Sequence, residues 1–248
     1  MNIINLKSSI PSNFQMVFNT EEDKKYLQSL VEFVFLQFEE MFGKELLQGE
    51  DCLIYNNPNN HVPFLKYGNP LEIISCCSDL RYWAQFIYHL SHELTHYVLR
   101  KLRTDKNKVP KWIEETICEA ISLHTLRQSS DRWDECILYD LNPDYDLDIY
   151  KYFEEEFSKT GESELQTCRT FQQLQLIENT SESNRLARSL DRNYLVESFD
   201  DFPESIKDLV FYPIFMRSDL TIDFKLWRQV YPNSALIPIL EYIHPQIA

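Results

Sequence analysis

Glycine is scarce in this sequence, which has only four glycines among 248 residues. Because the tight turns between strands depend on glycine, this scarcity argues against an all-β fold and favours helices. The hydrophobic share of 44%, with 14% aromatic residues, supplies enough apolar surface for a sizeable core and excludes a disordered chain.

Basic residues are also few, since 24 Lys and Arg are outnumbered by 39 Asp and Glu and the net charge is −15. No stripe of Lys and Arg stands out, so we expect no nucleic-acid partner. The excess acid is expected to serve solubility, and it also favours basic substrates.

The sequence lacks a signal peptide, a long apolar run and a cysteine framework. Residues Met1–Met16 have neither the apolar core nor the positive charge of a secretory leader, and no stretch of about twenty apolar residues follows. The six cysteines include the adjacent pair Cys76 and Cys77, which is not a CxxC pair. We therefore expect a cytoplasmic protein with reduced, mostly buried thiols and no membrane partner.

The first third of the chain changes its pattern from helical to extended. Apolar residues recur at helical spacing over 20–47, where Gly43 is expected to disturb or end the helix. The runs 52–55 and 71–76, and more weakly 62–67, are short, apolar and bounded by Asn, Pro and Gly, which predicts a small sheet. Residues 71–76 are either an edge strand that holds an extended peptide or an ordinary strand of the sheet.

A long helix is predicted over residues 79–102, and it contains the pattern His-Glu-x-x-His from His92 to His96. Two histidines four positions apart leave the same face of a helix, and Glu93 can lean over a metal without binding it. The helix is apolar almost all round, so these polar groups are buried and need partners, of which a metal ion is one. His89 either lines the same site or is a hydrogen-bonded core histidine.

A second helix is predicted from Pro110 through Leu126, and it carries Glu114, Glu115 and Glu119. Glu115 and Glu119 are four positions apart, so their carboxylates share a face and repel each other. On a buried face such a pair needs a cation against it. A zinc ion held by histidines is a suitable cation.

Eighteen residues separate His96 from Glu115, and Trp112 stands three positions before that glutamate. A His-Glu-x-x-His helix followed at this spacing by Trp-x-x-Glu resembles the active-site segment of the gluzincin zinc metallopeptidases, which include the thermolysin and aminopeptidase N types. The resemblance covers residues 70–126. It implies an α+β, zincin-like fold with a small mixed sheet and an active-site helix. Apolar residues recur at helical spacing through much of 129–248, which predicts a predominantly helical C-terminal lobe.

The resemblance further implies a zinc metallopeptidase that hydrolyses peptide bonds in a peptide or protein substrate. It implies that His92, His96 and Glu115 bind Zn²⁺ and leave a fourth position open. Glu93 would be the catalytic base that takes a proton from the water activated by zinc. Glu119 would accept a hydrogen bond from a zinc-binding histidine and so fix its tautomer.

The chain departs from the aminopeptidase N branch at two places. Leu71–Cys77 lacks the Gly-x-Met-Glu-Asn segment that binds the amino terminus of a substrate there, and Thr116 replaces a glycine that is usual in that branch. Aminopeptidase activity is therefore not supported, and exopeptidase and endopeptidase activity both stay open. The family stabilises the oxyanion with a downstream Tyr or His. Tyr194 is the candidate by its distance along the chain, and a packing or surface role is its alternative.

The predicted organisation is a zincin-like core over residues 1–128, which holds the zinc site, and a helical C-terminal subdomain over 129–248 that completes the cleft. The alternative function is a non-enzymatic binding or regulatory protein on a zincin scaffold with a structural zinc. The intact Glu93 favours the enzyme, because a purely structural site has no use for a general base.

Overall fold

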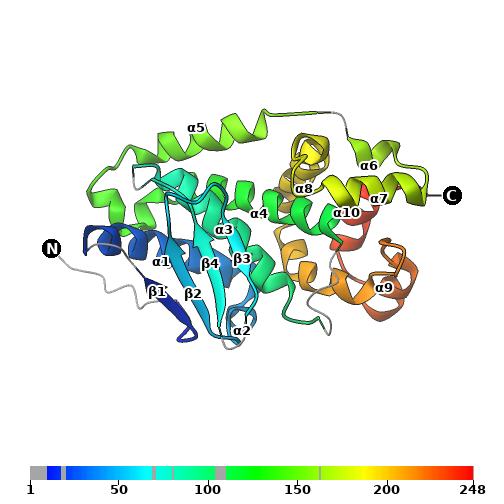
Figure 1. Cartoon of the computed structure of the whole chain (residues 1–248), viewed down its shortest axis with the longest axis horizontal. Coiled ribbons are helices and arrows are strands. Elements are labelled where there is room, and N and C mark those ends of the chain that lie inside the picture. The colour runs from blue at the N-terminus through cyan, green and yellow to red at the C-terminus, as the bar shows by residue number, and fades with distance from the viewer. Residues whose placement is uncertain are drawn as a thin grey trace. The chain divides into compact units, whose positions relative to one another are not determined.

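A small mixed sheet combined with many helices makes this an α+β protein, as expected from the sequence (Figure 1). The computed structural model describes residues 10–17, 21–68, 71–79, 81–103, 110–161 and 163–247. Residues 1–9 of the stretch Met1–Met16, where no leader is expected, lie outside these described ranges.

The sheet has four strands in the order β1-β2-β4-β3. β1 (Phe14–Val17), β2 (Cys52–Asn56) and β4 (Glu72–Cys76) are parallel, and β3 (Phe64–Lys66) is antiparallel to β4. The three strands expected from the sequence are present, and β1 is an addition to them. Because β4 pairs with β2 on one side and β3 on the other, residues 71–76 form an ordinary internal strand and not an edge strand.

The alternation of buried side chains explains why the short apolar runs become strands. In β2, Cys52, Ile54 and Asn56 are buried whereas the residues between them are less so, which is the two-residue period of a strand with one covered face. α1 (Glu21–Phe42) contacts this sheet, since the ring of Phe35 lies 4.7 Å from that of Phe14 in β1.

Gly43 ends α1, as its position in the sequence suggested. Its φ of 88° and ψ of 151° belong to a backbone region that is almost restricted to glycine. The chain then begins the short helix α2 (Lys44–Leu47), which leads into the sheet.

The chain forms two compact units, and each takes two separate stretches of sequence. The first unit consists of Met1–Leu94 and Thr125–Phe153. Its core contains an aromatic cluster in which the ring of Trp83 lies 4.7 Å from that of Tyr145 and 5.9 Å from that of Trp133. These contacts explain why the stretch after residue 125 belongs with the sheet.

The second unit consists of Thr95–His124 and Glu154–Ala248 and is helical. Trp112 is fully buried in it. The Trp112 backbone N–H donates to Glu178 Oε2 at 3.0 Å, and its indole N–H donates to the carbonyl of Leu220 at 3.0 Å. The elements between residues 145 and 243 are α5 (Tyr145–Phe157), α6 (Glu164–Thr167), α7 (Phe171–Thr180), η3 (Leu186–Arg188), α8 (Ser189–Asp201), η4 (Pro203–Phe215), α9 (Phe224–Val230) and α10 (Leu236–Ile243).

These units differ from the predicted division at residue 128. Two long helices contribute to both units: α3 (Trp83–Leu99) and α4 (Lys111–Asp131). The α+β class and the largely helical second half agree with the prediction. The zincin-like arrangement stays a prediction.

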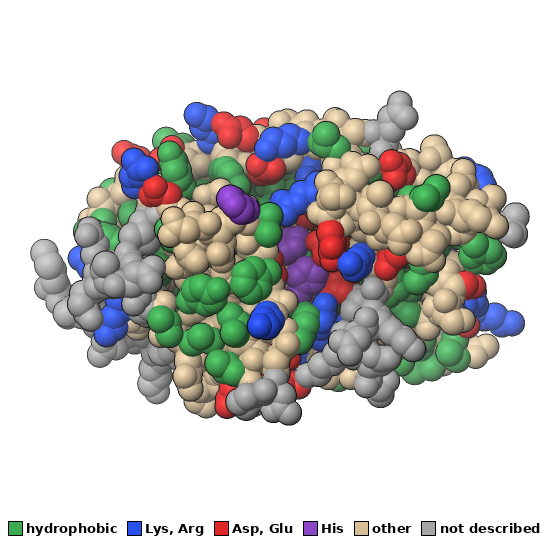
Figure 2. Space-filling view, in the orientation of Figure 1, with side chains coloured by type: hydrophobic (Ala, Val, Ile, Leu, Met, Phe, Trp, Pro, Cys, Tyr) green, Lys and Arg blue, Asp and Glu red, His purple; other side chains and the backbone are tan. Residues whose placement is uncertain are grey.

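The surface carries many charged side chains (Figure 2), and the cysteines are free and mostly buried, as the composition led us to expect. On the face drawn in Figure 2, acidic and basic side chains are interspersed with small hydrophobic patches. All six cysteines are free thiols, and five of them are buried. Among the helices of the described ranges, none has the combined length and apolar character needed to cross a membrane.

Candidate metal centre

The helix α3 that carries the His-Glu-x-x-His pattern is fixed at its start by polar contacts. The side chain of Asn56, at the end of β2, donates to the carbonyl of Ser78 at 2.7 Å and accepts from the Ser78 N–H at 3.0 Å. Ser78 Oγ in turn lies 3.0 Å from His89 Nδ1. His89 is thus a buried, hydrogen-bonded histidine, the second of the two interpretations that the sequence allowed.

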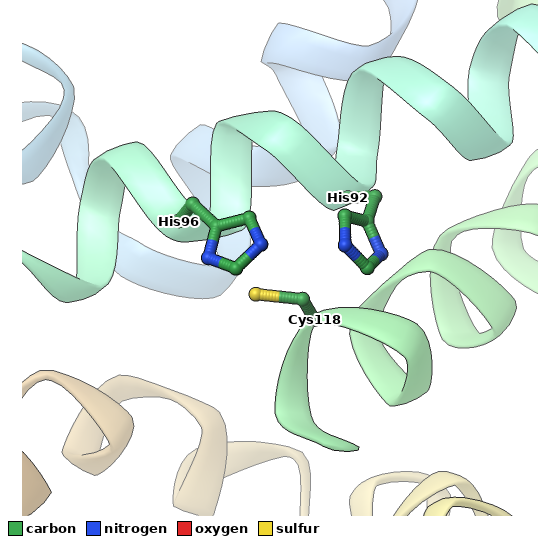
Figure 3. Close-up of side chains that lie close together, drawn as sticks. All are labelled: His92, His96 and Cys118. Atoms are coloured by element: carbon green, nitrogen blue, oxygen red, sulfur yellow. The ribbon is translucent and has the colours of Figure 1, made fainter. Parts of the chain in front are cut away.

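His92 and His96 lie one turn apart on α3, and both residues are buried, with 4% and 8% exposure. Their imidazoles leave the same side of the helix and face α4 (Figure 3). Cys118 of α4 completes a group whose metal-binding atoms all lie within 4.8 Å of one another. The chain therefore brings together two imidazoles and a thiol, all of which are zinc-binding groups.

Cys118 was not among the residues singled out from the sequence. The signal for it was present, because Cys118 lies three positions after Glu115 and so close to the same face of α4. Its thiol is fully buried, and burial raises its pKa to about 12 although His96 opposes this effect.

Glu114 is the carboxylate that orients His96. Its Oε1 lies 2.8 Å from His96 Nδ1, and its side chain is only 3% exposed. Arg100 Nε and Arg103 Nη1 approach the same carboxylate at 3.3 Å and 4.0 Å. Burial alone raises the pKa of Glu114, but His96 and the two arginines outweigh it and hold the pKa below its usual value.

The other nitrogen of the same imidazole faces Glu115. His96 Nε2 lies 3.6 Å from Glu115 Oε1. Two ligand atoms that share a tetrahedral zinc ion are about 3.4 Å apart when the zinc–nitrogen and zinc–oxygen bonds are each about 2.1 Å. The separation of these two atoms therefore fits a pair of ligands to one metal ion.

The charge of His96 depends on its neighbours. Burial lowers the pKa of this imidazole, but its contacts with Cys118 and Glu114 outweigh that effect and raise the pKa well above the ordinary value. The contact with Glu114 therefore favours protonation of His96. Binding of a metal to Nε2 requires that this proton leave.

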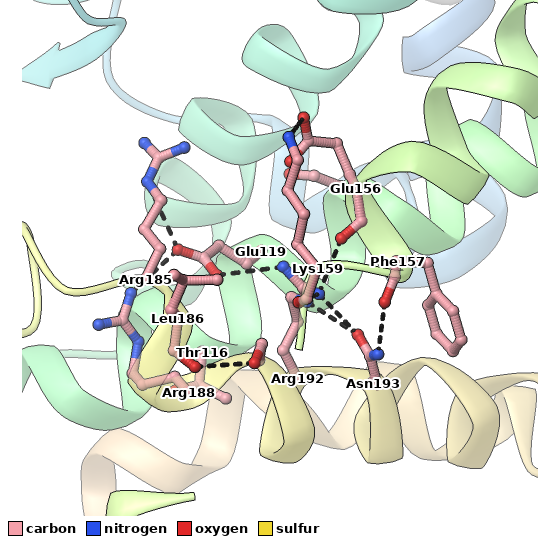
Figure 4. Close-up of polar contacts among 12 residues, drawn as sticks. Thr116, Glu119, Glu156, Phe157, Lys159, Arg185, Leu186, Arg188, Arg192 and Asn193 are labelled. Carbon is pink, nitrogen blue, oxygen red and sulfur yellow. Dashed lines mark hydrogen bonds and ion pairs between the residues drawn. The ribbon is translucent and has the colours of Figure 1, made fainter. Parts of the chain in front are cut away.

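Glu119, the predicted hydrogen-bond acceptor for a zinc-binding histidine, has different neighbours. Its carboxylate is fully buried and lies 2.9 Å from Arg188 Nη2, 3.7 Å from Arg185 Nε and 4.0 Å from Arg192 Nη1 (Figure 4). In the described part of the chain, arginines rather than a histidine contact this carboxylate. Glu114 holds the position at His96 that was expected for Glu119.

The predicted catalytic base, Glu93, is also buried, with 4% exposure. Its charge contributes to raising the pKa of the Cys76 thiol, after the larger effect of burial. Its role as a base stays a prediction.

Tyr194, the candidate for oxyanion stabilisation, stacks on Tyr242 with ring centroids 4.2 Å apart. This contact gives it a packing partner, and the catalytic role stays a prediction.

Tyr212 is a second tyrosine whose pKa is affected by the charges of the centre. Burial, followed by the charges of Glu114 and Cys118, raises its pKa well above the usual value. Within the described ranges its fully buried hydroxyl has no hydrogen-bond partner.

The centre thus gathers His92, His96 and Cys118 around one point, with Glu115 against His96 on one side and Glu114 on the other. Such a donor set suits zinc, which binds nitrogen, sulfur and carboxylate oxygen. No model of a protein family, no curated protein and no solved structure matches this chain.

Proposed function

We propose that this protein is a zinc-dependent peptidase with a zincin-like core, in which His92, His96 and Glu115 hold the metal. The observation that carries the proposal is the environment of His96. One nitrogen of its ring lies 2.8 Å from Glu114, and the other lies 3.6 Å from Glu115. An imidazole oriented by one carboxylate and facing a second donor is the usual arrangement of a metal-binding histidine.

Three further observations support a catalytic centre. His92 lies one turn earlier on the same side of α3, so it can contribute a second nitrogen. Glu93 follows it directly and is buried. The small mixed sheet beside this helix agrees with the zincin-like arrangement that the sequence resemblance implies.

The zinc ion, Glu93 and Glu114 have different roles in the proposed reaction. A bound zinc ion would supply Lewis-acid activation of a water molecule and of the peptide carbonyl. Glu93 accepts the proton of that water and returns it to the amine that leaves, which is the function of a general base followed by that of a general acid. Glu114 keeps the proton of His96 on Nδ1, so that Nε2 is directed to the metal.

A structural zinc site is the second candidate function, and Cys118 is the observation that favours it. Four protein ligands are typical of closed structural sites, whereas catalytic sites keep one position open. The proximity of the Cys118 thiol to both histidines supplies such a fourth ligand. Removal of the metal would then lower the stability of the protein with no peptidase activity to lose.

Metal analysis and one substitution test the proposal. Protein purified without chelators is expected to hold about one zinc per chain. Glu93→Gln is expected to retain the zinc and to reduce hydrolysis of a mixed library of unstructured peptides by about a hundredfold or more. The control is Glu197→Gln, which changes an exposed glutamate of α8 and leaves both quantities unchanged.

Two results would contradict the proposal. Protein that binds no zinc, even after incubation with the metal, would rule out the centre. A Glu93→Gln variant that hydrolyses peptides as fast as the parent would rule out the role of this carboxylate as the base. Zinc binding with no hydrolysis of any peptide by the parent protein would favour the structural site.

A further inference from the structure

Cys118 occupies a position that its packing alone does not explain. The protein has other buried thiols, and most buried cysteines act as small hydrophobic groups. Cys118 differs because its Sγ belongs to the group of metal-binding atoms within 4.8 Å of one another. In the described part of the chain, this is the one group of at least three His, Cys, Asp or Glu side chains that meets this criterion.

The distances suit a sulfur ligand. A tetrahedral zinc ion with a zinc–sulfur bond of about 2.3 Å and a zinc–nitrogen bond of about 2.1 Å places the two ligand atoms about 3.6 Å apart. The sulfur of Cys118 and the ring nitrogens of the two histidines are no more than 4.8 Å apart. Closing the remaining gap of about 1 Å requires only small rotations about side-chain bonds.

We propose that Cys118 is a fourth protein ligand, which closes the metal centre in the resting protein. This inference rests on the metal centre proposed above. When the metal binds, the Cys118 S–H bond breaks, a sulfur–metal bond forms and the proton passes to solvent. With His92, His96 and Glu115, whose oxygen faces His96 Nε2 at 3.6 Å but is not part of that group of three, the sulfur would fill all four positions of a tetrahedral ion.

A closed centre has a direct consequence for activity. Water needs a free position on the metal, so hydrolysis requires that Cys118 leave. The thiol therefore acts as an internal inhibitor that keeps the peptidase silent until a substrate or another ligand displaces it. Replacing Cys118 by alanine is expected to weaken metal binding and at the same time to raise peptide hydrolysis.

Cobalt provides a test that does not depend on activity. Cobalt(II) replaces zinc at such sites, and a bond between thiolate and cobalt gives a strong charge-transfer absorption in the near ultraviolet. The protein loaded with cobalt is expected to show this absorption, and Cys118→Ser is expected to bind cobalt without it. The control is Cys136→Ser, because Cys136 is also buried and burial also raises its pKa to about 12. This variant is expected to keep the absorption.

The outcomes separate the two proposals. A parent protein that binds cobalt without the near-ultraviolet absorption overturns the role of Cys118 and leaves the metal centre standing. A parent protein that binds neither zinc nor cobalt overturns both. If Cys118→Ser fails to fold, Glu115→Gln loaded with cobalt provides the second measurement. This variant is expected to keep the sulfur absorption, and its loss would contradict the proposed ligand set.

Discussion

Glu114→Gln offers the sharpest test of how this centre is built. The substitution keeps the size of the side chain and one oxygen for the Nδ1 hydrogen of His96, but it removes the negative charge. That charge lies 2.8 Å from His96 and within 4.0 Å of Arg100 and Arg103. The side chain of Arg103 is only 5% exposed, so solvent replaces little of the lost interaction.

Two effects of different size follow from these contacts. Removing one partner of a buried ion pair costs about 3–5 kcal/mol of stability, and the oxygen that glutamine retains places the cost of Glu114→Gln at about 3 kcal/mol. Losing the carboxylate that orients a metal-binding histidine weakens metal affinity by about 10–100-fold. Both effects are expected in the same protein.

Glu115→Gln is the matched comparison, because it changes the neighbouring residue in the same way. The side chain of Glu115 is 17% exposed and its oxygen lies 3.6 Å from His96, so its loss is expected to cost only about 1 kcal/mol in the metal-free protein. Its effect on zinc affinity should exceed that of Glu114→Gln, since it removes a ligand rather than a neighbour of one.

Urea unfolding of the metal-free variants measures the first effect, and competition with a chromophoric zinc chelator measures the second. The expected result is a crossed ranking, in which Glu114→Gln loses more stability and Glu115→Gln loses more affinity. If Glu114→Gln loses more zinc affinity than Glu115→Gln, the two glutamates have been assigned to the wrong roles. If neither variant changes zinc affinity, the centre itself is wrong.

Three other substitutions test features of the fold. Glu119→Gln should lower the free energy of unfolding in urea by about 3–5 kcal/mol, because Arg188 and Arg192 beside it are buried. Glu241→Gln, in the exposed pair with Arg228, is the control and should lower it by less than about 1 kcal/mol. Equal losses in the two variants would contradict this difference in burial. Gly43→Ala should lower the free energy of unfolding by about 1–3 kcal/mol because its φ of 88° is strained for alanine, and an unchanged unfolding midpoint would refute this. Burial raises the pKa of Asp191 to about 6, so its contribution to stability is full below about pH 4 and is lost as the pH rises through 6. Asp191→Asn should therefore raise the free energy of unfolding by up to about 3 kcal/mol at pH 8 and hardly at all at pH 4. A gain in this free energy that is the same at both pH values would count against this reasoning.

Local periodicity made much of the fold predictable. The helix with the His-Glu-x-x-His pattern follows from the spacing of its apolar residues, and the start of the glutamate-bearing helix follows from Pro110. Three of the strands follow from short apolar runs bounded by Asn, Pro and Gly, and the end of α1 follows from Gly43. β1 was missed because Val17 is apolar but exposed, so the sequence of this strand does not alternate between apolar and polar residues. The position of β4 inside the sheet depends on the pairing of β2 and β3 with it, which no local pattern contains.

The metal centre was predictable where it depends on one helix and less so where two elements meet. The shared face of His92 and His96 follows from helix geometry alone. Helix geometry does not show whether Glu114 or Glu119 contacts His96, because the partner of Glu119, Arg188, lies 69 positions further along the chain. The two nitrogens of an imidazole point in different directions, so adjacent glutamates can each face one of them, as Glu114 and Glu115 do at His96.

The contacts of Trp112 have a consequence for the order in which the protein matures. The start of α4 is held by Glu178 and by Leu220, which lie 66 and 108 positions further along the chain. A ribosome synthesises the histidines and glutamates of the centre well before it adds these two residues. Until Glu178 and Leu220 have left the ribosome, α4 therefore lacks the contacts that hold its start, and metal capture is expected only after that point. A chain truncated before Leu220 should retain all the proposed ligands and still bind zinc poorly.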